Sequence, residues 1–152
     1  PTAPKEERIH VYVCELTKRT YRSKEEVVVT GPEVAYTLLK DRFRHGEARE
    51  HFVIVLLSAR HAVIGVETVS IGSLNASIVH PREVFRPAIT QAAAAVILAH
   101  NHPSGNPDPS DDDLALTRRL AQVGELVGIP VIDHLVIAGD GFLSFKQSGY
   151  LT

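Results

Sequence analysis

The residues best suited to chemistry lie in one stretch, residues 98–113, with the sequence LAHNHPSGNPDPSDDD. His100 and His102 are two positions apart, so on an extended chain their side chains project from the same face and can reach one metal ion. Asp113, on the first turn of a following helix, can supply a third ligand. Three protein ligands leave zinc an open position for water, which is the catalytic arrangement, and water bound in this way ionises with a pKa of about 7.

Each of these residues also has a plainer interpretation. The His-Asn-His triplet could be a polar surface loop, because histidine is often no more than a polar residue. Ser110 and Asp113 are spaced as in a capping box, in which a serine and an acid three residues later satisfy the start of a helix. Asp111 and Asp112 are charges that complement a helix dipole. The spacing alone is therefore compatible with both a metal site and a helix cap.

The first half of the chain must supply part of the framework for this stretch. β-Branched residues predict two short strands at 9–16 and 26–30. A helix is predicted from Pro32, because proline suits the first helical position. Two apolar runs, at 52–57 and at 62–66 with an extension toward residue 71, then predict paired and well-buried strands.

The second half is predicted to alternate helices and strands. A helix that begins near Pro81 contains Pro87 and is therefore expected to be short or kinked. The clearest helix begins at Ser110, a natural N-cap. Its apolar stripe consists of Leu116, Leu120, Val123 and Val127. Strands are predicted at 131–138 and 142–145, joined by a tight turn.

This order of elements predicts a mixed α/β layered domain rather than a helix bundle or a β-sandwich. The length of 152 residues suits one domain, and the net charge of −2 gives no sign of a nucleic-acid or anionic membrane partner. Cys14 is the only cysteine, which excludes an internal disulfide and a cysteine-rich zinc cluster. Because no apolar run approaches the roughly 20 residues that span a bilayer, and the polar start is unlike a secretory signal, we expect a soluble cytoplasmic protein.

The stretch resembles the JAMM motif of the MPN metalloprotease superfamily, which is His-x-His, seven residues, serine, two residues and aspartate. The motif is met in full by His100, His102, Ser110 and Asp113. HNHPSG at 100–105, NASIVHPRE at 75–83 and DHLVI at 133–137 are similar to the bacterial RadC branch in order and spacing. The likeness implies an MPN/JAMM-type α/β domain, a mixed β-sheet flanked by helices with layering like that of cytidine deaminases.

Carried over residue by residue, the resemblance implies that His100, His102 and Asp113 bind zinc. It implies that Ser110 stabilises the oxyanion formed on a substrate carbonyl. The superfamily also places a glutamate ahead of the first core strand, where it takes a proton from water and passes it to the leaving amine. Glu50, just before the run at 52–57, matches that placement.

Five residues have open assignments. Glu50 could be a solvated charge at a strand end, in which case Glu83 and then Glu67 are the alternatives for the acid/base. Asp133 and His134 could support the metal ligands from a second layer, or they could form a satisfied polar pair in the core.

The resemblance divides the chain into an N-terminal extension, residues 1–30, and a RadC-like JAMM/MPN domain, residues 31–152. RadC proteins commonly carry a helix-hairpin-helix segment suited to DNA, but residues 1–30 contain no such glycine-containing hairpin, which weakens a link to DNA repair.

The leading hypothesis is a zinc metallohydrolase that cleaves a peptide or isopeptide bond in a protein or peptide substrate. The alternatives are a non-catalytic interaction module, since some MPN domains are scaffolds, and accessory DNA binding. HNH nucleases disperse their three residues instead of placing them side by side. Zinc nucleobase deaminases need His-x-Glu with Pro-Cys-x-x-Cys, which a chain with one cysteine cannot supply.

Overall fold

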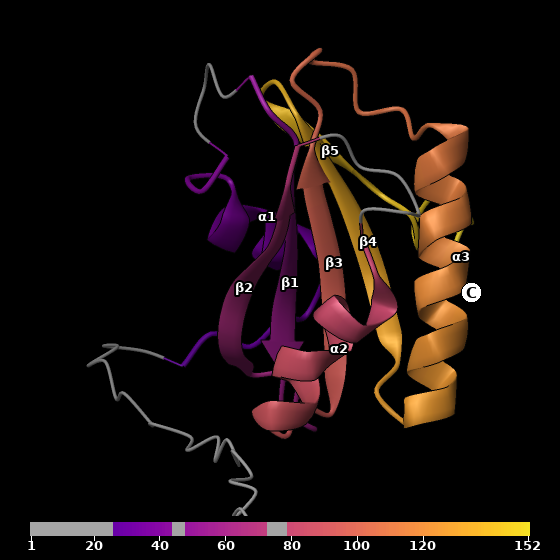
Figure 1. Cartoon of the computed structure of the whole chain (residues 1–152). Helices are drawn as coiled ribbons and strands as arrows, with labels where there is room; N and C mark the ends of the chain where they lie inside the picture. The colour runs from indigo at the N-terminus through magenta and orange to yellow at the C-terminus, as the bar shows by residue number, and fades with distance from the viewer. Residues whose placement is uncertain (1–25, 44–47, 73–78) are drawn as a thin grey trace, which may run out of the picture.

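The computed structural model describes residues 26–43, 48–72 and 79–152. A five-stranded sheet with the order β2-β1-β3-β4-β5 forms the middle layer (Figure 1). Its strands are β1 (His51–Leu57), β2 (Val63–Ile71), β3 (Ala95–Asn101), β4 (Val131–Ala138) and β5 (Gly141–Ser144). The helices within the described residues are α1 (Pro32–Leu39), α2 (Pro81–Thr90) and α3 (Asp111–Val127).

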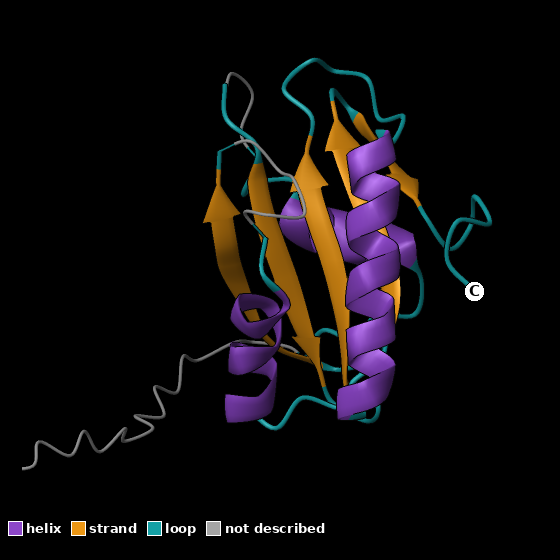
Figure 2. Cartoon of the chain, turned by 45° about the vertical axis from the view of Figure 1, so that its right-hand side comes forward, coloured by secondary structure: helices purple, strands orange, loops and turns teal. Residues whose placement is uncertain are grey.

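The sheet separates two apolar cores. α2 and α3 lie over one face and α1 lies behind the other, as Figure 2 shows. Alternate residues of β1 divide between these faces because successive side chains of a strand point in opposite directions. The α2/α3 core contains Phe52, Ile54 and Leu56, whereas the α1 core contains Val53, Val55 and Leu57. The predicted layered α/β fold is confirmed.

The connection between β3 and β4 brings the two ends of the motif together. These strands are parallel, whereas β1 pairs antiparallel with both β2 and β3, and β4 pairs antiparallel with β5. A parallel pair needs a crossover, which here is α3. The loop 102–110 therefore runs from the end of β3 to the start of α3 at one end of the sheet (Figure 1).

Local signals at both ends fix the limits of α3. Ser110 is the N-cap, and Gly128, in the left-handed conformation with a φ of 74°, is the C-cap. Leu116 and Leu120 are buried against the sheet, and Val123 packs partly against the same core. Val127, the last member of the predicted stripe, is 44% exposed because the helix ends there.

The structure also differs from the sequence predictions in two places. The strand predicted at 26–30 is only an isolated bridge between Val28 and Ala62. β2, predicted to be well buried, has only half-buried and exposed residues, because it lies at the edge of the sheet. The helix predicted to be short or kinked is α2, which has ten residues and contains Pro87 at its seventh position. The strand predicted at 9–16 lies outside the described residues. Among the helices of the described segments, none has both the length and the apolar character needed to cross a membrane.

Candidate metal centre

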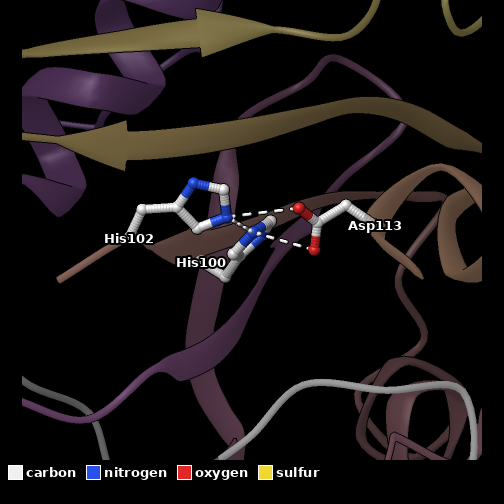
Figure 3. A group of neighbouring side chains, drawn as sticks. All are labelled: His100, His102 and Asp113. Carbon is white, nitrogen blue, oxygen red and sulfur yellow. Dashed lines mark hydrogen bonds and ion pairs between the residues drawn. The ribbon is translucent and has the colours of Figure 1, made fainter. Parts of the chain in front are cut away.

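Three predicted ligands from two elements meet at the end of the sheet. His100 lies near the end of β3, His102 follows that strand directly, and Asp113 is the third residue of α3. Figure 3 shows the two imidazoles turned toward the carboxylate. His100 Nε2 is 2.9 Å from His102 Nε2 and 3.2 Å from Asp113 Oδ1, and His102 Nε2 is 3.2 Å from Asp113 Oδ2. Within the described residues, this is a group of donor atoms that could hold a metal ion.

The chemistry of the donor set fits a cation. His102 Nδ1 lies 2.8 Å from the main-chain oxygen of Asn106, and because a carbonyl oxygen only accepts, Nδ1 is the donor. In the neutral ring, His102 Nε2 is then an acceptor that faces the accepting carboxylate of Asp113. Ligand atoms about 2.1 Å from a tetrahedral zinc lie about 3.4 Å apart, so the observed separations need little adjustment.

The helix cap and the ligand group turn out to be one arrangement. The Ser110 amide donates to Asp113 Oδ2 at 2.8 Å, and the Asp113 amide donates to Ser110 Oγ at 3.1 Å. This capping box fixes the orientation of the carboxylate that faces the histidines. The Ser110 side chain is exposed, and accepting a hydrogen bond leaves its hydroxyl proton available for donation.

Asp113 and His102 of this group, and the neighbouring His134, have shifted pKa values. Burial opposes a charge on Asp113, but the imidazoles of His100 and His102 outweigh it and hold the pKa of this carboxyl well below its usual range. The hydrogen bond to Asp113 raises the pKa of His102 against the effect of burial. Burial lowers the pKa of His134 well below its ordinary value. A proton and a metal ion would therefore compete for His102 Nε2.

Glu50 lies immediately before β1, close enough for its charge to act on His102. The buried Asn101 side chain accepts from the His51 amide at 2.7 Å and donates to the Arg49 carbonyl at 3.0 Å, which holds the chain on both sides of Glu50. An open hollow of about 430 Å³ is lined by Glu50 and by Pro103, the residue after His102. The charge of Glu50 contributes to the raised pKa of His102.

The two alternative glutamates have other partners. Glu83 lies on α2 and forms ion pairs with Arg86 at 3.1 Å and Arg82 at 3.6 Å. Glu67 accepts a hydrogen bond from Gln91 at 3.3 Å. It pairs across the sheet with Ile54, two residues along β1 from the Phe52 that pairs with His100. Glu50, in contrast, contributes through its charge to the raised pKa of His102, a candidate ligand.

The side chains of the adjacent residues Asp133 and His134 lie on opposite faces of the sheet. The Asp133 carboxylate accepts from the His134 amide at 2.7 Å, the Ser144 hydroxyl at 2.6 Å and the Lys146 amide at 3.0 Å. These bonds tie β4 to the end of β5. The His134 ring lies on the opposite face, with Nε2 2.8 Å from His100 Nδ1.

Two polar side chains near the site were absent from the sequence predictions. Thr117 donates to the main-chain oxygen of Asp113 at 2.7 Å, and Asn101 holds the segment before β1. The sequence contains a signal for the Thr117 contact, because Thr117 follows Asp113 by four residues and the hydroxyl of a helical threonine often donates to the carbonyl four residues back. The sequence contains no such signal for Asn101, since its hydrogen-bond partners are about fifty positions away.

Comparison with known proteins agrees with this geometry. A family model described as the RadC-like JAB domain matches residues 29–150. The chain belongs to this family. The resemblance stated from the motif is thereby confirmed, and the His-His-Asp group lies inside the matched RadC-like JAB domain.

Similar proteins come from several bacteria. The UPF0758 protein of Caldanaerobacter subterraneus is 48% identical over 126 residues, which are 83% of this chain and 54% of that protein. The UPF0758 protein of Symbiobacterium thermophilum is 51% identical over 126 residues, 83% of this chain and 53% of that protein. That of Geobacillus thermodenitrificans is 47% identical over 141 residues, 90% of this chain and 61% of that protein. The chain thus spans little more than half the length of these curated relatives.

Proposed function

We propose that this RadC-like JAB domain is a zinc-dependent metallohydrolase that cleaves a peptide or isopeptide bond. The observation that carries the proposal is the convergence of His100 Nε2, His102 Nε2 and the Asp113 carboxylate, whose ligand atoms lie within 4.8 Å of one another. Two histidines and one carboxylate are a ligand set of catalytic zinc sites. Bound zinc supplies a water that ionises near neutral pH, and it polarises the carbonyl under attack.

The surrounding side chains have the roles that this chemistry requires. Glu50 takes the proton from the attacking water and transfers it to the leaving amine, which leaves poorly unless protonated. Glu50 lines a hollow together with Pro103, the residue after His102, and its charge acts on His102, which supports this role. The exposed Ser110 hydroxyl donates to the oxyanion that develops on the substrate carbonyl, and its place beside Asp113 in the capping box supports that assignment.

The decisive experiment separates metal binding from turnover. Zinc bound to the purified protein is measured by elemental analysis, and the zinc-loaded protein is incubated in ¹⁸O-labelled water with peptides prepared from a bacterial lysate. Hydrolysis of an amide places one ¹⁸O atom in each new carboxylate, which mass spectrometry detects. We expect close to one zinc per chain and labelled products from the wild-type protein.

Matched variants identify the residues responsible. Glu50→Gln keeps the size of the side chain but cannot carry the proton, so it should bind zinc normally and yield no labelled product. Glu83→Gln, on α2, is the control and should behave as the wild type. Cleavage that persists in Glu50→Gln would move the acid/base role elsewhere. Zinc binding without any cleavage would favour the non-catalytic interaction module, and absence of bound zinc would contradict the whole proposal.

A further inference from the structure

A chain of hydrogen bonds runs from the third candidate ligand back to the first through two buried side chains. The Thr117 hydroxyl donates to the main-chain oxygen of Asp113 at 2.7 Å. The same hydroxyl oxygen lies 2.6 Å from His134 Nδ1, and His134 Nε2 lies 2.8 Å from His100 Nδ1. Thr117 is 2% exposed and both histidines are 0% exposed, so solvent does not provide these rings with alternative partners.

The donor and the acceptor of every hydrogen bond in this chain follow from the bond at the Asp113 carbonyl. The Asp113 carbonyl oxygen only accepts, so Thr117 uses its single hydroxyl proton there. Thr117 Oγ1 can then only accept from His134, and His134 Nδ1 must carry a proton. The His134 ring lies between Phe52 and Phe145, with ring centroids 5.6 and 4.7 Å away, surroundings that disfavour an imidazolium ion.

A neutral His134 with its proton on Nδ1 has an accepting Nε2. His100 must therefore donate from Nδ1, which leaves its own Nε2 unprotonated and directed at Asp113. In the other tautomer, an N–H of His100 would occupy the position where a metal binds. His102 has a simpler arrangement for the same purpose, since its Nδ1 donates to the Asn106 carbonyl.

We propose that Thr117 and His134 are positioning residues that fix the tautomer of His100 and so prepare its Nε2 to bind metal. Histidine ligands commonly have the other ring nitrogen held by a carboxylate, a carbonyl or water. Here a second histidine and a threonine extend that link to the backbone of Asp113, which is itself a ligand. The inference rests on the metal site proposed above, but the tautomer is a property of the metal-free protein.

Nuclear magnetic resonance of the metal-free, ¹⁵N-labelled protein tests the tautomer directly. The ring nitrogens distinguish a protonated from an unprotonated position, and we expect His100 to be protonated at Nδ1 and unprotonated at Nε2. This measurement needs no variant. A His100 ring protonated at Nε2 would overturn the proposal.

Zinc affinity, measured by competition with a chromophoric chelator, tests the role of the chain. Thr117→Val replaces the hydroxyl by a methyl group of the same shape, and we expect it to weaken zinc binding about 10- to 100-fold. Thr117→Ser retains the hydroxyl and should restore the affinity. Thr117→Val with wild-type affinity would refute the positioning role.

Ser144→Ala is the matched control. It removes another buried hydroxyl bonded to a β4 residue, Asp133, but on the other face of the sheet. It should lower stability and leave zinc affinity unchanged, and an equal loss of affinity in both variants would show that Thr117 acts only through stability. If the wild-type protein bound no zinc, the proposed function would fail, while the NMR result would still decide the tautomer.

Discussion

Asp113 and Asp133 are both buried, at 4% and 6% exposure, yet their surroundings are opposite in kind. Asp133 accepts hydrogen bonds from two backbone amides and the Ser144 hydroxyl. Asp113 accepts from the Ser110 amide, but its carboxylate also faces the Nε2 atoms of His100 and His102 at 3.2 Å. A carboxylate surrounded by donors is a structural anchor, whereas one that faces other acceptors needs a cation.

The sheet lies between the Asp133 carboxylate and the candidate metal centre to which Asp113 belongs. Asp133 pairs with Ile97, which belongs to the α1 core, and the next residue, His134, pairs with Leu98, which belongs to the α2/α3 core. Adjacent residues of a strand point to opposite faces, so one anchors β5 and the other contacts a candidate ligand. Perturbing each side should therefore have separable effects on zinc binding and on folding.

The largest expected difference is the response to zinc. At a free zinc concentration of about 1,000 times Kd, a ligand that binds only the folded state stabilises it by about 4 kcal/mol. We expect this gain for the wild type and for Asp133→Asn, and none for Asp113→Ala, in urea unfolding with and without zinc. Equal zinc stabilisation of Asp113→Ala and the wild type would contradict the ligand role of Asp113.

In the metal-free protein, a change at Asp133 should be more destabilising than a change at Asp113. Asp133→Asn replaces the charged acceptor of three hydrogen bonds by a neutral amide, and its NH₂ takes the place of the oxygen to which the Ser144 hydroxyl donates. It should therefore lower the free energy of unfolding by about 1–3 kcal/mol. Asp113→Asn should cost less, because the amide can accept from Ser110 and donate to an imidazole nitrogen. Unfolding by urea in the presence of a chelator measures both. A larger cost for Asp113→Asn would break the comparison.

The smallest effect is a pH dependence confined to the Asp113 side. The pKa of His102 is raised by its hydrogen bond to Asp113. A raised pKa adds stability below the unfolded value of about 6.5, and this contribution is lost as the pH rises through the folded pKa. In chelator, the stability difference between wild type and His102→Gln should therefore shrink from about pH 6 to about pH 9.

The same rise in pH that reduces the contribution of His102 to stability should strengthen metal binding. Zinc affinity should increase over this pH range, because the proton no longer competes for His102 Nε2. The stability difference between wild type and Asp133→Asn should stay constant, since Asp133 is bonded to amides and a hydroxyl that do not titrate there. A constant His102→Gln difference would contradict the coupling to Asp113.

The sequence predicted most of the framework because its signals are local. The Ser110 cap, the apolar runs and the proline at the start of α1 act through neighbouring residues, and the elements form where they were expected. The strand predicted at 26–30 is an exception, since β-branched residues favour a strand but pairing partners decide its length. The division at residue 31 and the role of Glu50 remain predictions.

The sequence by itself determined two histidines on one side of an extended segment and the serine and aspartate of a helix cap, because both patterns depend on spacing along a short stretch of chain. Only the tertiary structure decided that the capping aspartate faces those histidines, since the parallel β3–β4 pair sets where α3 begins. It also decided that the His134 ring, and not the Asp133 carboxylate, contacts His100. Alternation along β4 requires the two to separate, but only the pairing with β3 determines which face each one takes.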